Sequence, residues 1–102
     1  MEKSIAFPKK DLMTELFLAE QNLNHSQELF WNKIKTNPQV WKCNDVIEDN
    51  FWVVARHENH IVWYNDIVEG FNISKFKIEG KILEYCGSKL ELTDVLNALK
   101  YV

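Results

Sequence analysis

Apolar residues recur at helical spacing over the first third of the chain. Between Asp11 and Lys35 they form one stripe, made of Leu12, Leu16, Ala19, Leu23, Phe30 and Ile34 and widened by Met13 and Phe17. Polar residues interrupt the stripe at 22–26, where Asn24 and Gln27 match the capping box that begins a helix. We predict two helical segments, or one helix that bends there. Asn37-Pro38 ends the helical zone, because the residue before a proline is disfavoured in the α conformation.

Residues 36–50 mix apolar and polar side chains without a sustained period. We expect a connection that is held on the domain by Val40, Trp41, Val46 and Ile47, with room for a short strand over 40–43.

The most informative stretch is a predicted hairpin with large apolar residues on both faces. It pairs Phe51–His57 with His60–Asp66 around the turn Glu58-Asn59, in which Asn59 tolerates a positive φ. In a regular two-residue register, one face holds Phe51, Val53, Ala55, Val62 and Tyr64, and the other holds Trp52, Val54, Ile61 and Trp63. An antiparallel sheet usually keeps one face wet, so the second face needs a cover of its own.

A second, amphipathic hairpin is predicted to pair Phe71–Ile78 with Lys81–Cys86 around Glu79-Gly80. Beyond it, Ser88 and Glu91 match a capping box, and Leu92, Val95, Leu96 and Leu99 follow at i, i+3, i+4 and i+7. These residues predict a C-terminal amphipathic helix. The order of elements predicts an α+β fold in a single domain, 1–102. N-terminal helical segments and a C-terminal helix cover one side of a four-stranded antiparallel meander of two hairpins, as a two-layer sandwich.

Composition and charge narrow the class of protein. The chain has 102 residues, 46% of them hydrophobic, and a net charge of −3. This balance gives no long-range attraction for nucleic acid or an anionic membrane, and no apolar run reaches the ~18 residues of a membrane span. Residues 1–10, with Pro8, Lys9 and Lys10, do not resemble an export signal. Two cysteines without CxxC spacing fit reduced thiols, so we expect a cytoplasmic protein.

Catalytic and metal-binding chemistry has weak support. The predicted turn sets His57 opposite His60 with Cβ atoms ~5 Å apart, and Glu58 is a possible third ligand. These two histidines are the weak metal candidates, but the set lacks the further His or Cys of a closed site. No flanking pattern activates Cys43 or Cys86 as a nucleophile beside a histidine base. We predict no catalytic residues and no cofactor.

Protein binding fits the pattern better. The acidic residues Asp45, Glu48, Asp49, Asp66 and Glu69 would steer a basic partner, and Trp52, Trp63 and Trp41 would form the desolvated anchor. A homodimer through the Trp52/Trp63 face is the simplest form. Alternatively, all the aromatic rings are core, or an internal pocket serves a small-molecule- or metal-binding domain or an enzyme.

In size, acidity and aromatic content the chain is similar in style to the immunity proteins that neutralise secreted bacterial toxins. The run from Trp63 to Asp66 and from Glu69 to Ser74 looks like that of a small bacterial single-domain protein. This resemblance implies a non-enzymatic, immunity-like or inhibitor-like domain that binds a basic protein.

Overall fold

The computed structural model describes residues 6–101, so the expectation about an export signal lies partly outside the described residues. In this part the chain forms three helices and a five-stranded sheet, which confirms the α+β class. The elements are α1 (Lys9–Glu20), α2 (His25–Ile34), β1 (Lys35–Asn44), β2 (Glu48–His57), β3 (His60–Asn65), β4 (Gly70–Lys75), β5 (Lys81–Ile82) and α3 (Leu92–Leu99). No helix among the described residues is long and apolar enough to cross a bilayer.

Two helical segments form at the N-terminal zone, as the break in its stripe predicts. Asn24 caps α2: its side chain accepts from the backbone N–H of Gln27, and the Gln27 side chain accepts from the backbone N–H of Asn24. This is the predicted capping box. The strand that follows is much longer than the predicted 40–43, because β1 begins directly after α2 and pairs with β2 along most of its length.

The sheet order is β4-β3-β2-β1-β5. The first four strands pair antiparallel, but β5 lies parallel to β1, with Lys81 opposite Lys42 and Ile82 opposite Cys43. The predicted second hairpin is therefore wrong. Its turn exists, since Gly80 has a φ of 89° and the Lys81 N–H donates to the Ile78 carbonyl oxygen. After Lys75, however, the chain leaves the edge formed by β4 and crosses the sheet to the opposite edge, where β5 pairs with β1.

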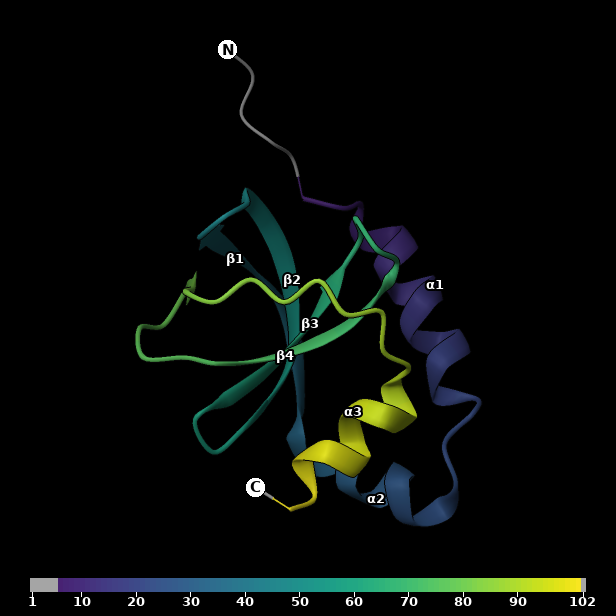
Figure 1. Ribbon diagram of the computed structural model, residues 1–102. Helices are drawn as coiled ribbons and strands as arrows, with labels where there is room; N and C mark the ends of the chain where they lie inside the picture. Colours follow the sequence, from purple (N-terminus) through teal and green to yellow (C-terminus); the bar gives the residue numbers. More distant parts are fainter. Residues whose placement is uncertain (1–5, 102) are drawn as a thin grey trace.

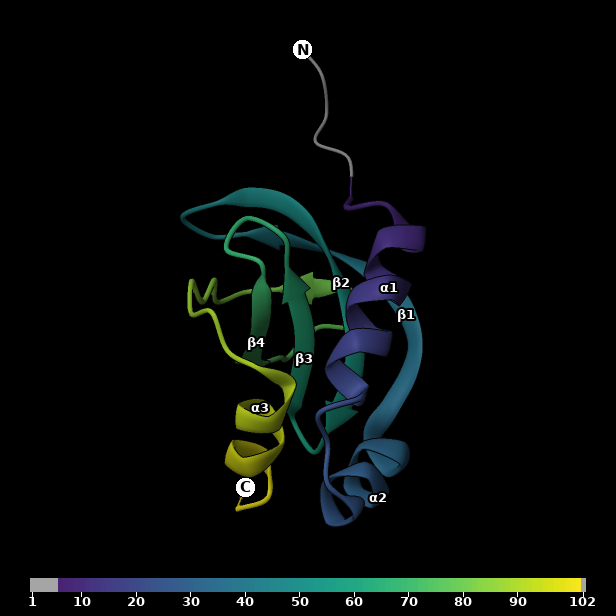
Figure 2. The same ribbon diagram turned by 90° about the vertical axis from the view of Figure 1, so that its right-hand side faces the viewer.

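This crossing explains why the sheet tolerates apolar side chains on both sides. The helices cover one face, and residues 76–90, here called the covering segment, run across the other (Figures 1 and 2). Phe76, Ile82 and Tyr85 of the covering segment pack on Trp41, Phe51 and Trp63. The arrangement is a helical layer, a curled sheet and a covering segment, in place of a two-layer sandwich.

Polar side chains of the sheet hold the covering segment in place. Asn65, Asn72 and Ser74 are the buried polar residues of the described chain, and their side chains donate to the carbonyl oxygens of Cys86, Ser88 and Glu84. Every second carbonyl of an extended stretch is thus bonded by a side chain instead of a neighbouring strand. Buried polar groups need such partners, and here they fix the position of the covering segment.

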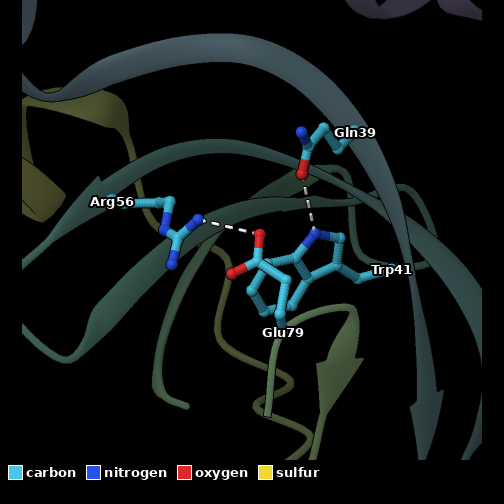
Figure 3. A network of polar contacts seen from close by, with 4 residues as sticks. All are labelled: Gln39, Trp41, Arg56 and Glu79. Atoms are coloured by element: carbon cyan, nitrogen blue, oxygen red, sulfur yellow. Dashed lines mark hydrogen bonds and ion pairs between the residues drawn. The ribbon is translucent and has the colours of Figure 1, made fainter. Parts of the chain in front are cut away.

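At the turn of the covering segment, Arg56 of β2 forms an ion pair with Glu79, with 2.9 Å between Nη1 and Oε2 (Figure 3). The Arg56 guanidinium also lies 4.8 Å from the centre of the Phe76 ring and 5.8 Å from that of Trp41. It ties residues 76–79 to the face they cover.

A β-bulge changes which side chains share a face. Val53 lies opposite Trp63 and Ala55 opposite Val62, so Val54 is one residue extra on β2. Because side chains alternate along a strand, one extra residue exchanges the faces of all residues on its far side. Phe51 and Val53 therefore join Trp63, whereas Trp52 packs on the helical side.

The C-terminal helix buries the predicted residues Leu92, Val95, Leu96 and Leu99 against the helical face. It begins later than predicted, because Glu91 and Asp94 form its capping box. The predicted cap, Ser88, belongs to the covering segment, where its carbonyl oxygen accepts from the Asn72 side chain.

Candidate protein-binding site

The three tryptophans expected to anchor a partner share no open surface. Trp63 is 0% exposed and Trp41 is 2% exposed, both within the core under the covering segment. Trp52 is half-buried on the opposite face, where its Nε1 donates to the carbonyl oxygen of Phe7. The prediction that Trp52 and Trp63 line one open face is wrong, because the bulge separates them and the covering segment seals one side. The single face expected for a homodimer therefore does not form, since Trp63 is in the core and Trp52 lies on the other side of the sheet.

His57 and His60 are directly opposed in the β2–β3 pairing, as predicted. The His57 ring packs edge-on against Phe30, with 5.2 Å between ring centres. Burial, then the charges of Lys75 and His57, lower the pKa of His60, whose Nδ1 is buried without a hydrogen-bond partner in the described chain. No group of three or more His, Cys, Asp or Glu residues in that part is placed to hold a metal ion. The two histidines therefore serve to pack the β2–β3 turn.

The environment of Cys43 opposes activation of its thiol. Cys43 is buried, and burial raises the pKa of its thiol, with smaller contributions from the charges of Asp45 and Asp49 and an opposing backbone hydrogen bond from Asp45. A nucleophilic cysteine needs its pKa lowered, so this environment opposes thiolate chemistry. Cys86 lies in the covering segment and its Sγ is 3.5 Å from the Ser88 Oγ.

The acidic residues do gather. The β1–β2 turn (45–47) and the β3–β4 turn (66–69) lie at the same end of the molecule, the upper end in Figures 1 and 2. We call this the acidic end, made of the five predicted residues Asp45, Glu48, Asp49, Asp66 and Glu69. Burial, together with the charge of Asp49, raises the pKa of Asp66 against the effect of its own backbone hydrogen bond. Carboxylates from two distant parts of the sequence therefore act on each other.

The acidic residues have different roles. Asp45 fixes the covering segment, since its Oδ2 accepts from the Tyr85 backbone N–H at 2.8 Å. Glu48 and Glu69 are exposed, and Asp66 is half-buried. Glu69 and Asp66 have no Lys or Arg partner within 4.0 Å among residues 6–101. In that part of the chain the ion pair joins Arg56 and Glu79.

A small pocket opens beside the acidic end, between α1, the start of β4 and the residues just before α3. Its volume is about 190 Å³, and it is lined by Glu15, Leu18, Ala19, Asn22, Tyr64, Glu69, Gly70, Phe71 and residues 89–92. We call it the Tyr64 pocket. Tyr64 is 4% exposed, and its ring packs against the rings of Phe7 and Phe71, each with 5.3 Å between ring centres. Burial, and then the charges of Glu15, Glu69 and Asp66, raise the pKa of Tyr64 to about 12.

Neither Glu15 nor Tyr64 was predicted to belong to a site. The alternation along β3 places Tyr64 on the same face as Val62, as observed, but gives no sign that Glu15 and Glu69 lie near it. Glu15 lies on α1, far from Glu69 in sequence, and only the packing of α1 beside β3 and β4 brings them together. The sequence does point to Asn65, Asn72 and Ser74 as structurally important polar residues, because each interrupts an otherwise apolar strand.

A larger, open groove of about 570 Å³ lies between α1 and the first half of β1. Its lining includes Met13, Leu16, Phe17, Trp31, Pro38 and Val54, with Glu20 as its one carboxylate. The Glu20 Oε2 accepts from the Trp31 Nε1 at 2.7 Å. This groove has the size of a small-molecule site but presents no group that is poised for catalysis.

Comparison with protein-family models, with curated proteins and with solved structures gave no match in any of the three searches.

Proposed function

We propose that this chain is a protein-binding domain that acts without catalysing a reaction and binds a basic protein partner through the acidic end. Binding and neutralising a basic toxin, as an immunity protein does, is the concrete form of this proposal. A cytoplasmic setting suits its two free thiols.

The observation that carries the proposal is the convergence of carboxylates around the Tyr64 side chain, beside the acidic end. Glu15, Asp66 and Glu69 all act on Tyr64, and none of the three has a Lys or Arg partner within 4.0 Å among residues 6–101. Like charges that are held together oppose folding. A basic partner would neutralise them, and the same charges would steer it into place.

Apolar side chains at the tips of the two turns supply contact area in place of the buried tryptophans. Val46 is 83% exposed in the β1–β2 turn, and Ile67 is 50% exposed in the β3–β4 turn. Apolar residues beside charges of one sign form a surface that a partner can desolvate while its own charges pair at the rim.

The test is retention of proteins from an extract of the source cells on the immobilised chain at low salt. Two triple variants are compared: Glu48→Gln with Asp66→Asn and Glu69→Gln, and a control of Asp11→Asn with Glu28→Gln and Glu84→Gln. Each removes three negative charges and brings the net charge from −3 to 0. We expect a basic protein to be retained by the wild type and the control, and lost from the acidic-end variant. Equal retention on both variants, or no retained protein, would refute the proposal.

A second candidate function is binding of a small apolar molecule in the α1–β1 groove. Its volume of about 570 Å³ and its exposed Met13 and Phe17 favour this candidate. Native mass spectrometry of the purified chain distinguishes the two candidate functions. A bound small molecule that is lost in Phe17→Ser would support the groove as a binding site. A chain without a bound molecule would count against it.

A further inference from the structure

We infer that the outer side of β1 over residues 36–41, here called the open edge, binds an extended segment of a second protein. The segment adds a strand to the sheet and places an apolar side chain in the α1–β1 groove. This inference goes beyond the proposed function, because the open edge belongs to the half of β1 that follows α2, whereas the acidic end lies at the other end of that strand. It also assigns the groove to a peptide chain in place of a small molecule.

The outer side of β1 is paired only near the end of the strand. β5 lies opposite Lys42 and Cys43, and no other strand of the described chain pairs with that side (Figure 2). The Lys42 N–H donates to the Gly80 carbonyl oxygen at 3.0 Å, so it points outward. Because backbone directions alternate along a strand, the N–H and C=O of Val40 point to the same side. Val40, which is 45% exposed, therefore offers a donor and an acceptor to an additional strand.

The α1–β1 groove lies on the same face of the sheet as the Val40 side chain. Val40 is opposite Trp52, which packs on the helical side. Pro38, two residues before Val40, lines the groove together with Met13 and Phe17 of α1. Phe17 is 61% exposed. An added strand would therefore have every second side chain beside an apolar groove, which is how sheet edges bind extended peptides: backbone bonds give affinity and pockets for alternate side chains give specificity.

The charges around the open edge select the occupant. Lys35 lines the groove, Lys42 follows the open edge, and β1 contains no carboxylate. The Lys35 ammonium has no carboxylate partner within 4.0 Å among residues 6–101. Glu20, the carboxylate of the groove lining, already accepts from the Trp31 Nε1. A segment that carries an apolar residue followed by a carboxylate complements this arrangement.

A second copy of this chain fits the open edge poorly. Pairing of two β1 edges would bring lysines of both copies together without a carboxylate from either strand. Pro38 has no N–H to donate, and the pairing with β2 is irregular between Lys35 and Gln39. Prolines, lysines and bulges are devices that keep exposed edges from pairing with one another. Here they leave Val40 available to a short segment of different sequence.

The test is an NMR titration of the full chain with the peptide acetyl-Leu-Val-Glu-amide. When this probe runs antiparallel to β1, its leucine exchanges both backbone hydrogen bonds with Val40, and its glutamate lies toward Lys35. We expect saturable binding with a dissociation constant on the order of 1 mM, a downfield shift of the Val40 amide proton and a shift of the Phe17 amide signal.

Two N-methylated forms of the probe test the backbone pairing. Methylation of the leucine nitrogen removes the donor to the Val40 carbonyl oxygen and should weaken binding about tenfold. Methylation of the valine nitrogen, which points away from β1, should change binding by less than about twofold. The two forms have the same composition and charge, so only the position of the methyl group differs.

Variants of the protein locate the site. Val40→Pro removes the outward N–H and should weaken binding about tenfold, whereas the matched control Val40→Thr keeps that N–H and should bind within about twofold of the wild type. Phe17→Ser and Lys35→Gln should each weaken binding about threefold. Lys100→Gln, which removes the same charge beyond α3, should leave binding unchanged.

Equal binding of the two N-methylated probes, equal binding to Val40→Pro and Val40→Thr, no saturable binding, or shifts confined to other residues would each overturn the inference. A Val40 amide signal that moves with protein concentration in the absence of the probe would assign the open edge to a second copy, and would also overturn it. Signal dispersion verifies the fold of each variant, and if Val40→Pro does not fold, the two N-methylated probes decide the question.

Discussion

Tyr64 combines a buried ring with an ionisable group that the fold keeps neutral. Burial and three nearby carboxylates raise its pKa from 10.0 to about 12. The unfolded state therefore loses the phenol proton first as the pH rises. Stability that is fully present below pH 10 is lost between pH 10 and about 12.

The corresponding prediction is a late-titrating phenol in the native protein. Ultraviolet absorbance of phenolate, compared between the wild type and Tyr64→Phe, should give a difference curve with its midpoint at about pH 12. Above pH 10 the free energy of unfolding of the wild type should fall as Tyr64 titrates, and this contribution to the fall should be absent in Tyr64→Phe. A difference curve centred at pH 10 would show that the hydroxyl is not in this environment.

Glu58 has a strained backbone conformation. It has a φ of 55° in the β2–β3 turn, whereas Asn59, the residue expected to take a positive φ, does not. Glycine adopts this region without a Cβ clash and is favoured at the first position of such turns.

We predict that Glu58→Gly raises the free energy of unfolding by about 0.5–1 kcal/mol, since relief of strain exceeds the added chain entropy. Asn59→Gly is the matched control and should lower stability, because it adds entropy without relieving strain. Denaturant unfolding measures both, and equal changes in the two variants would rule out this explanation.

At the level of elements, the covering segment depends on side chains for its hydrogen bonds. The two N–H groups of the Asn65 Nδ2 are shared among three acceptors, the Asn72 side chain, the Tyr85 hydroxyl and the Cys86 carbonyl oxygen. The Asn65 Oδ1 accepts from the Ile67 N–H. Asn65 is fully buried, so water cannot replace these bonds.

Asn65→Ala should lower the free energy of unfolding by about 2–3 kcal/mol, because buried groups lose their partners. Amide hydrogen exchange should rise over residues 83–90 more than in β2. The control is Asn97→Ala on the exposed side of α3, for which we expect a change within about 0.5 kcal/mol. Unchanged exchange in the covering segment would mean that other contacts hold it.

The sequence predicted elements well wherever local chemistry decides. The capping box at Asn24, the stripe of α3 and the opposed pair of His57 and His60 are all confirmed. The bulge at Val54 was not predictable, because no glycine or proline marks it. The parallel pairing of β5 with β1 depends on long-range burial of Phe76, Ile82 and Tyr85, which a local hairpin pattern does not contain.

At the scale of the whole molecule, the chain buries both faces of its own sheet. Trp63 illustrates this: it packs against Phe51 and Tyr85, and its Nε1 donates to the Ser74 hydroxyl at 3.0 Å. A ring in this position belongs to the core of a single chain.

Trp63→Ala should therefore lower the free energy of unfolding by about 3–5 kcal/mol. Val46→Ala, at an 83% exposed position, should change it by less than about 0.5 kcal/mol. Thermal or denaturant unfolding distinguishes the two. If Trp63→Ala kept the stability of the wild type, the ring would not belong to the core, and the aromatic face would again be a candidate interface.

The candidate site was predictable only in part. The acidic residues of the two turns were found from composition and position, and the register of β2 with β3 brings their turns to one end. The approach of Glu15 to Tyr64 depends on the way α1 packs, which no short pattern specifies. A regular register misplaces Trp52, which the bulge turns to the helical face, and the local pattern does not show that the covering segment buries Trp41 and Trp63.

The most direct test of the account compares the affinities of the two triple variants for one basic probe, a peptide of alternating lysine and alanine. Both variants have the same net charge, so only the position of the charges differs. At low salt we predict that the acidic-end variant of Glu48, Asp66 and Glu69 binds about tenfold more weakly than the Asp11/Glu28/Glu84 control. Equal affinities would show that binding follows net charge alone, and would contradict a recognition surface at the acidic end.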